Sequence, residues 1–220
     1  MKNYTTVIFD LDGTLLDTLA DLADGVNIAL RQCGFPEKTT EEVCMAVGNG
    51  VVRLMERVVP DGKNNPAFET CLGVFRTEYA RISQNKTCPY EGIPELLSHL
   101  DAAGLKLAVV SNKFHNAVVD LVRHYFPIIP VSAGEREADG IRKKPAPDTV
   151  LWVMEQFGVT AEECVYIGDS DVDIETAKNA GMDCISVTWG FRDRTFLAEH
   201  GAAVYADTPA DLEKLLLKKD

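Results

Sequence analysis

The chain has 220 residues, of which 46% are hydrophobic and 25% charged, as in globular proteins that bury a sizeable core in one large or two small domains. Its 34 acidic residues outnumber its 22 basic ones, and the formal charge of -12 argues against a general affinity for nucleic acid or for an anionic membrane. Six scattered cysteines without a C-x-x-C pair, no signal-peptide pattern and no apolar run of membrane-spanning length lead us to expect a cytoplasmic protein with neither a disulfide framework nor a zinc site.

The first predicted element is a strand at residues 5–9, where a short apolar run rich in β-branched residues is typical of a strand buried on both faces. Two aspartates, Asp10 and Asp12, follow this strand with one residue between them. Keeping two like charges ionised beside a buried strand costs free energy. Either a bound cation offsets this cost, or the pair belongs to a capped turn that leads into a helix.

Residues 16–89 show only helical patterns, and we expect them to form a helical domain inserted after the first strand. An apolar stripe runs from Leu16 to Leu30 and ends before Pro36, and residues 51–59 and 68–82 continue the helical pattern. The hinges of the insertion are expected at residues 14–18 and 88–92. The rest of the chain, residues 1–15 and 90–220, would form the core domain.

The insertion also contains a Gly-Asn-Gly segment at residues 48–50. It lacks the third glycine and the preceding strand of a dinucleotide-binding fingerprint, so a turn between two helices is the simplest interpretation. The alternative is a loop that reaches the active site, with the guanidinium group of Arg53 binding a substrate carboxylate. In the first interpretation, Arg53 is a solvated surface residue.

Beyond the insertion, predicted strands alternate with predicted helices. Strands are expected at residues 105–110, 128–131, 165–167 and 184–187. Helical patterns begin near Pro94, at Pro147 and at Asp171, and each ends at a glycine, as proline and glycine preferences at helix ends predict. Strands that alternate with helices pair in parallel, so the expected fold class is α/β with a doubly wound parallel sheet.

Polar side chains follow several of these strands. Ser111, Asn112 and Lys113 follow the second strand, Lys143 and Lys144 follow the third, and an acidic segment at residues 168–173 follows the fourth. In open parallel sheets, ligands bind outside the carboxyl ends of the strands. Carboxylates suit Mg²⁺, whereas a lysine and a hydroxyl group suit a phosphoryl group. Together with Asp10 and Asp12, these groups favour the metal site over the capped turn.

Four motifs, in this order, resemble those of the haloacid dehalogenase superfamily: DLDGT at 10–14, VVSN at 109–112, KPAPD at 144–148 and GDSDVD at 168–173. The helical insertion resembles the C1 cap of that superfamily. The segment WGFRDRTFLAEHGA is similar to the tail of its phosphoglycolate phosphatase-like members. The resemblance implies a Mg²⁺-dependent enzyme acting on a small phosphorylated metabolite.

The resemblance assigns the catalytic chemistry to three residues. Asp10 would be the nucleophile and a Mg²⁺ ligand, and Asp12 the general acid and base, whose backbone carbonyl also touches the metal. Lys144 would neutralise the phosphoryl charge. Lys143 is the register alternative, and we rank it second because Lys144 directly precedes Pro145.

The resemblance also implies metal-binding, supporting and phosphate-binding residues. Asp169 would complete the metal site, Asp173 would orient Lys144 or a metal-bound water, and Ser111 and the N–H of Asn112 would hold phosphate oxygens. Beyond the resemblance, we expect Thr14 and Arg53 to contact the substrate and Ser170 to be a supporting residue.

The expected function is hydrolysis of a small phosphomonoester through an aspartyl-phosphate, with phosphoglycolate as the best substrate. Three alternatives remain: phosphoryl transfer as in β-phosphoglucomutase-like relatives, pyrophosphate hydrolysis, and a non-catalytic module that accepts or binds a phosphoryl group. The mutases usually carry a different residue at the position of Thr14, and the chain is longer than receiver-type signalling modules. We expect no nucleic acid or membrane partner, and the sequence leaves the oligomeric state open.

Overall fold

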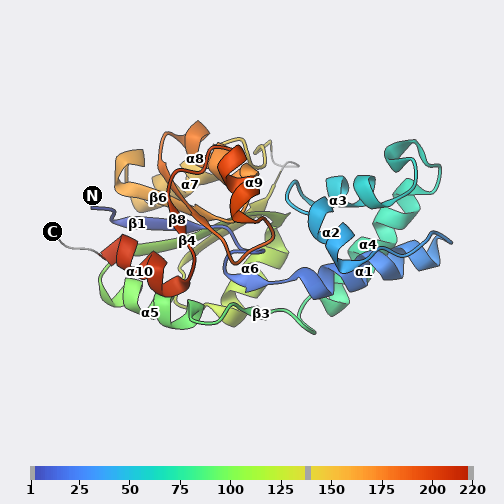
Figure 1. Ribbon diagram of the computed structural model, residues 1–220, viewed down its shortest axis with the longest axis horizontal. Helices are drawn as coiled ribbons and strands as arrows, with labels where there is room; N and C mark the ends of the chain where they lie inside the picture. The colour runs from blue at the N-terminus through green and yellow to red at the C-terminus, as the bar shows by residue number, and fades with distance from the viewer. Residues whose placement is uncertain (1–2, 137–139, 218–220) are drawn as a thin grey trace. The chain divides into compact units, whose positions relative to one another are not determined.

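The chain divides into two structural units, which the computed structural model describes over residues 3–136 and 140–217. One unit combines the residues up to Leu16 with those from Pro89 onward, and the other is Asp17–Cys88. Two short strands, β2 (Leu16–Asp17) and β3 (Cys88–Pro89), pair at the two crossing points (Figure 1). In the described ranges, no helix has the length and apolar character needed to cross a membrane.

A six-stranded sheet lies at the centre of the first unit, with the strand order β5-β4-β1-β6-β7-β8. Neighbouring strands pair in parallel throughout. The strands are β1 (Thr6–Phe9), β4 (Lys106–Phe114), β5 (Val131–Glu135), β6 (Cys164–Gly168), β7 (Asp183–Val187) and β8 (Tyr205–Ala206). The strand order changes direction at β1, so β1 and its neighbours β4 and β6 lie where ligands bind in such sheets.

Helices cover both faces of this sheet (Figure 1). Val7 and Phe9 of β1 belong to one apolar cluster and Ile8 to another, because successive side chains of a strand point to opposite faces. The first cluster includes side chains of α5 (Ile93–Ala102), α6 (His115–Tyr125) and α10 (Pro209–Leu217). The second includes side chains of α7 (Asp148–Phe157) and α8 (Asp171–Ala180). The predicted doubly wound α/β fold is therefore confirmed.

The remaining elements of this unit connect the layers. A short 3-10 helix, η3 (Ala161–Glu163), precedes β6, and α9 (Arg194–Glu199) lies between β7 and β8. Proline and glycine lie at the helix ends as expected: Pro94 lies in the first turn of α5, and Gly158 and Gly181 follow the last residues of α7 and α8 with φ of 63° and 72°. This left-handed conformation is readily adopted by glycine, which has no Cβ.

Two strand predictions were wrong in position. The strand expected at residues 128–131 is β5, which begins at Val131, and Ile128 is exposed. Pro127 and Pro130 explain the shift, since proline has no N–H to donate to a sheet ladder. In addition, β4 continues past residue 110 to Phe114, so Ser111 and Asn112 lie within the strand and not after it.

The second unit is built from helices around its own apolar cluster. Its elements are α1 (Leu19–Gln32), α2 (Thr40–Ala46), α3 (Val51–Val58), the 3-10 helix η1 (Gly62–Asn64) and α4 (Phe68–Ile82). The predicted stripe began too early, because Leu16 lies in β2. Helix α2 was not predicted, although Thr39 and Glu42 form a capping box at its start. The function of this unit as a cap stays a prediction.

A buried aspartate ties the two ends of the second unit together. Asp21, in the first turn of α1, is fully buried. Its carboxylate accepts hydrogen bonds from the backbone N–H groups of Lys86 and Thr87 and from Thr87 Oγ1, at 2.8–3.1 Å. These contacts anchor the segment that leads into β3. Hydrogen bonds from N–H groups to a charged carboxylate are stronger than those to a neutral acceptor.

Replacing this carboxylate should destabilise the protein. We expect Asp21→Ala to lower the free energy of unfolding by about 2–3 kcal/mol, because it leaves buried donors without an acceptor. Denaturant titration followed by circular dichroism would measure the change. Asp24→Ala is the matched control: Asp24 is 45% exposed and pairs with Lys86, so its loss should cost less than about 1 kcal/mol. Equal losses would contradict the anchoring role.

Candidate active site

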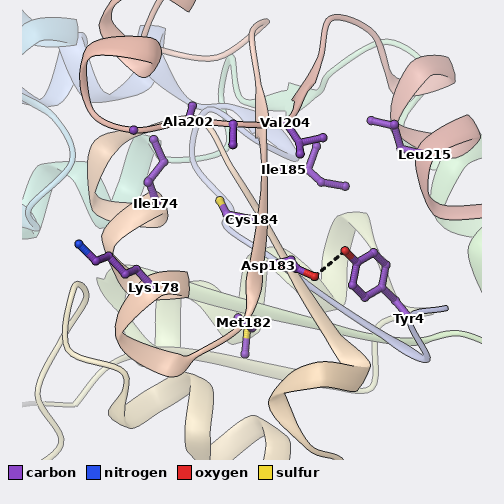
Figure 2. A pocket seen from close by; sticks show the side chains of 12 residues that line it. Tyr4, Ile174, Lys178, Met182, Asp183, Cys184, Ile185, Ala202, Val204 and Leu215 are labelled. Atoms are coloured by element: carbon purple, nitrogen blue, oxygen red, sulfur yellow. Dashed lines mark hydrogen bonds between the residues drawn. The ribbon is translucent and has the colours of Figure 1, made fainter. Parts of the chain in front are cut away.

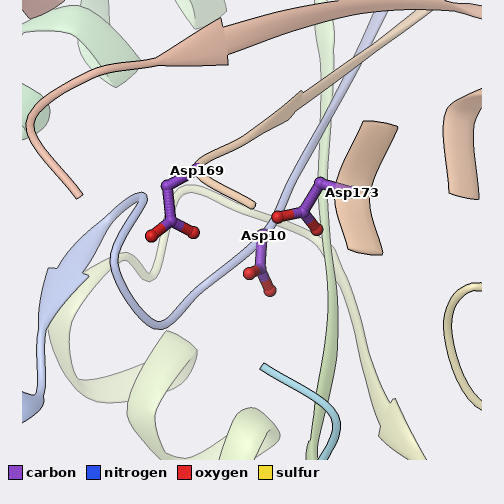
Figure 3. A group of neighbouring side chains, drawn as sticks. All are labelled: Asp10, Asp169 and Asp173. Carbon is purple, nitrogen blue, oxygen red and sulfur yellow. The ribbon is translucent and has the colours of Figure 1, made fainter. Parts of the chain in front are cut away.

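Three buried aspartates meet at the carboxyl ends of β1 and β6. Asp10 follows β1, Asp169 follows β6, and Asp173 lies in the first turn of α8. Figure 3 shows the three side chains, which approach from three different segments. One carboxylate oxygen of each lies within 4.8 Å of the others, and the residues are 8%, 2% and 0% exposed. Of these three, Asp10 and Asp169 are predicted metal ligands and Asp173 is a predicted supporting residue.

A buried lysine links two of these aspartates. Lys144 Nζ lies 2.9 Å from Asp10 Oδ1 and 2.8 Å from Asp173 Oδ1. It also donates a hydrogen bond to the hydroxyl of Tyr166 at 3.0 Å, and that hydroxyl donates to the Val110 carbonyl. Lys144 is 4% exposed, whereas its neighbour Lys143 is half-buried. Of the two register alternatives, Lys144 is therefore the lysine that lies beside the aspartates.

The site carries more negative than positive charge. Burial, together with the charge of Asp173, raises the pKa of Asp10 to about 7, although Lys144 opposes the shift. Burial and the charges of Asp173 and Asp10 also raise the pKa of Asp169 well above its usual value. Burial alone would lower the pKa of Lys144, but the carboxylates outweigh it and hold that pKa well above its usual value. Lys144 contacts Asp10 and Asp173, and the guanidinium group of Arg192 partly offsets the raised pKa of Asp169.

The donor set fits a divalent cation that prefers oxygen ligands. Buried carboxylates lose hydration and repel one another, and a bound cation reduces both costs because it neutralises part of their charge. Mg²⁺ accepts carboxylate oxygens as ligands. Two hydrogen bonds hold the Asp169 carboxylate in place: Oδ2 accepts one from the Phe191 N–H at 2.7 Å, and Oδ1 accepts one from Thr14 Oγ1 at 3.4 Å. A Cβ at Gly13 or Gly190 would overlap Asp169, so glycine is required at both positions.

Asp12 does not belong to this group of three carboxylates, although its charge also contributes to the raised pKa of Asp10. Its Oδ1 accepts a hydrogen bond from Lys113 Nζ at 2.8 Å, and its side chain is 15% exposed. The predicted metal contact of Asp12 is through its backbone carbonyl, and the role of its side chain in proton transfer stays a prediction. Lys113 follows a predicted strand, and no role is predicted for it. No local pattern links two residues that are 101 positions apart.

Ser111 and Asn112, predicted to hold phosphate, are buried in β4 next to β1. Asn112 Nδ2 donates to the Lys144 carbonyl at 3.0 Å, and Ser111 Oγ accepts a hydrogen bond from the Lys113 N–H at 3.2 Å. Ser170 supports Asp173, because both its N–H and its hydroxyl donate to Asp173 Oδ2. Ser170 and Asp173 form the capping box of α8.

Two predicted substrate residues have partners of their own. The Thr14 hydroxyl is buried and directed at Asp169, as described above. Arg53, in α3 of the second unit, pairs with Glu56 at 2.6 Å, and its side chain is 55% exposed. The predicted contact of Arg53 with a substrate carboxylate stays a prediction. Tyr166 was missed because its sequence position, inside a buried strand, indicated a core residue.

A groove of about 500 Å³ lies elsewhere on the first unit (Figure 2). Tyr4 and Asp183 line it and share a hydrogen bond of 2.8 Å, and Met182, Cys184 and Val204 add apolar surface. Tyr4 precedes β1 and Asp183 begins β7, so this groove lies at the amino ends of the strands. It is therefore separate from the aspartates at the carboxyl ends.

Known proteins resemble this chain over most of its length. A family model described as haloacid dehalogenase-like hydrolase matches residues 7–187. A phosphoglycolate phosphatase of Pseudomonas putida is 33% identical, over 96% of this chain and 78% of the relative. One of Aquifex aeolicus is 35% identical, over 84% of this chain and 85% of the relative. A crystal structure from Lactobacillus delbrueckii subsp. bulgaricus, assigned provisionally as a phosphoglycolate phosphatase, has a TM-score of 0.93 and 40% identity, with 100% of both chains covered.

Proposed function

Because the chain belongs to the haloacid dehalogenase-like hydrolase family, we propose that it is a Mg²⁺-dependent phosphatase that hydrolyses a small phosphomonoester. The resemblance of its four motifs to that superfamily is thus confirmed. The observation that carries the proposal is the buried group of Asp10, Asp169 and Asp173 with Lys144 against two of them. Such a group provides a nucleophile and the charges that a phosphoryl group needs.

The first half of the proposed reaction forms a covalent intermediate. A carboxylate oxygen of Asp10 attacks phosphorus, and the bond between phosphorus and the ester oxygen breaks as the new bond forms. Asp12 gives its proton to the departing oxygen, so the product leaves as an alcohol. Lys144, the Ser111 hydroxyl and the Asn112 N–H stabilise the negative charge on the phosphoryl oxygens.

The second half regenerates the enzyme. Asp12, now a carboxylate, takes a proton from water as the water oxygen attacks phosphorus, and the bond to Asp10 breaks to release phosphate. A Mg²⁺ ion, when bound, neutralises part of the charge of the aspartates and of the phosphoryl group. Asp10 and Asp169 would hold the ion with the backbone carbonyl of Asp12, and Asp173 lies close enough to take part.

We propose phosphoglycolate as the substrate to test first. Two relatives that are 33% and 35% identical bear the name phosphoglycolate phosphatase. In this proposal the helical unit acts as a cap, and Arg53 exchanges Glu56 for the carboxylate of the substrate. A guanidinium group suits this exchange, because it can bind the carboxylate of a substrate through two parallel hydrogen bonds, as it can that of a protein side chain.

A substrate screen with and without a chelator would test the function. We expect phosphate release from phosphoglycolate in millimolar Mg²⁺, with a loss of at least about 100-fold in excess EDTA and recovery on adding Mg²⁺ back. Sugar phosphates and pyrophosphate belong in the same screen. Faster turnover of pyrophosphate, or isomerisation of a sugar phosphate without phosphate release, would contradict the monoesterase proposal. Full activity in EDTA would contradict the role of the metal.

A further inference from the structure

Lys113, which is buried, and Asp12, which is half-buried, form an ion pair that no role described so far requires. Lys113 Nζ lies 2.8 Å from Asp12 Oδ1, and the side chains are 5% and 15% exposed. Burial removes much of the hydration of the Lys113 ammonium group. Leaving this charge buried without a partner would be costly, so its pairing with Asp12 is favoured. Because both residues belong to the first unit, the contact is a property of that unit alone.

An irregularity in the sheet sets the position of Lys113. Val110 of β4 pairs with Ala133 of β5, but the next paired residues are Phe114 and Glu135, so three residues of β4 stand opposite one residue of β5. A bulge of this kind redirects the side chains of the longer strand. Ser111 Oγ accepts the Lys113 N–H at 3.2 Å and stabilises this conformation.

The single residue opposite the bulge is Gly134, and it has no room for a side chain. A Cβ at this position would overlap the carbonyl oxygen of Lys113 and the backbone of His115. The backbone of β4 therefore lies directly against β5 at Lys113. Because the backbone is held on this side by Gly134 and locally by Ser111, the ammonium group reaches Asp12 from a defined position.

The contact leaves the two oxygens of Asp12 in different situations. Oδ1 is bound by Lys113, whereas in the described part of the chain no group donates a hydrogen bond to Oδ2. The carboxyl group cannot rotate about the Cβ–Cγ bond without breaking the ion pair. Oδ2 is thus the oxygen that can exchange a proton with a substrate, and its direction is fixed by a group that does not itself react.

We propose that Lys113 is a positioning residue that orients Asp12 for proton transfer to the departing oxygen of the substrate. This inference rests on the proposed phosphatase function. In the step concerned, the phosphorus–oxygen bond of the ester breaks, and the proton moves from Asp12 Oδ2 to the released oxygen while Lys113 keeps its hydrogen bond to Oδ1. Proton transfer is efficient only when the donor lies within hydrogen-bond reach of the acceptor.

Esters with different leaving groups provide the test. Phosphoglycolate and ethyl phosphate release alkoxides, which need a proton as they depart, whereas p-nitrophenyl phosphate releases a stable phenolate. Lys113→Met is expected to lower kcat/KM about 10- to 100-fold for both alkyl esters and less than about threefold for the aryl ester. We choose kcat/KM because it reports the steps up to release of the alcohol, before water attacks the intermediate.

Three further comparisons separate orientation from folding. Lys113→Arg keeps the charge and a donor and should recover part of the alkyl ester activity. Lys106→Met removes a lysine from the same strand, whose Nζ donates a hydrogen bond to the Phe157 carbonyl at 2.8 Å, and should leave the turnover of all three esters unaffected. In an Asp12→Asn background, Lys113→Met should cause no further selective loss, because the group it orients is gone.

The other outcomes would overturn the inference. An equal loss for all three esters would indicate a structural role, and no loss would show that the ion pair is not needed. A loss confined to phosphoglycolate would mean that Lys113 binds the substrate carboxylate directly. If the wild-type protein turned over none of the esters, the proposed function itself would be wrong, and the inference would fall with it.

Discussion

Asp10→Asn should abolish steady-state phosphate release, with a loss of at least about 10³-fold in kcat. The substitution keeps the size of the side chain but replaces the attacking oxygen by an amide, which is a poor nucleophile. Asp10 also belongs to the group of three carboxylates that could hold the metal, so the same change removes one of the proposed metal ligands. Both effects act on the covalent step, and no other described carboxylate is predicted to replace Asp10 as the nucleophile.

The control for this prediction comes from the same acidic cluster of the sequence. Asp171 is the first residue of α8 and is interpreted as an acid that favours the start of the helix. Asp171→Asn should therefore change kcat by less than about threefold. Thermal unfolding without Mg²⁺ should show that Asp10→Asn is at least as stable as wild type, because one of three mutually repelling charges is lost. Sustained turnover by Asp10→Asn within tenfold of wild type would rule out the covalent mechanism.

Lys144→Met should reduce both activity and stability. Without the ammonium group, Asp10 and Asp173 lose a partner at 2.9 Å and 2.8 Å and remain buried. Removing one member of a buried ion pair typically costs about 3–5 kcal/mol, so we expect a loss of this size in the free energy of unfolding at neutral pH. The rate should fall by at least about 100-fold, because the phosphoryl charge loses a fixed cation.

Two comparisons make this prediction specific. Lys143→Met alters the neighbouring, half-buried lysine and should cost less than about 1 kcal/mol. The double variant Lys144→Met/Asp173→Asn should recover part of the lost stability, because it removes one of the two buried carboxylates that have lost their cationic partner. Chemical denaturation and phosphate release would measure the two effects. A stable, fully active Lys144→Met protein would show that Lys143 or another group supplies the positive charge.

The sequence alone was sufficient for the fold class and for the location of the acids. The run at β1 is buried at every position, and the glycines after α7 and α8 end those helices where expected. These features depend on short stretches of chain, whose apolar pattern and backbone preferences act locally. Because the carboxyl ends of parallel strands share one edge, placing acids after β1 and β6 already indicated that they would meet.

The tertiary structure alone decided which groups touch. It distinguished Lys144 from Lys143 by burial, placed the Tyr166 hydroxyl beside Lys144, and paired Lys113 with Asp12 across 101 positions. It also showed that Ser111 lies within β4, because this strand extends past residue 110, where the apolar run ends. The position of Lys113 follows from the register of β4 and β5 and from the bulge opposite Gly134, which are properties of paired segments. Local sequence sets the character of each strand, but the ion pairs of the site depend on how distant segments of the chain align.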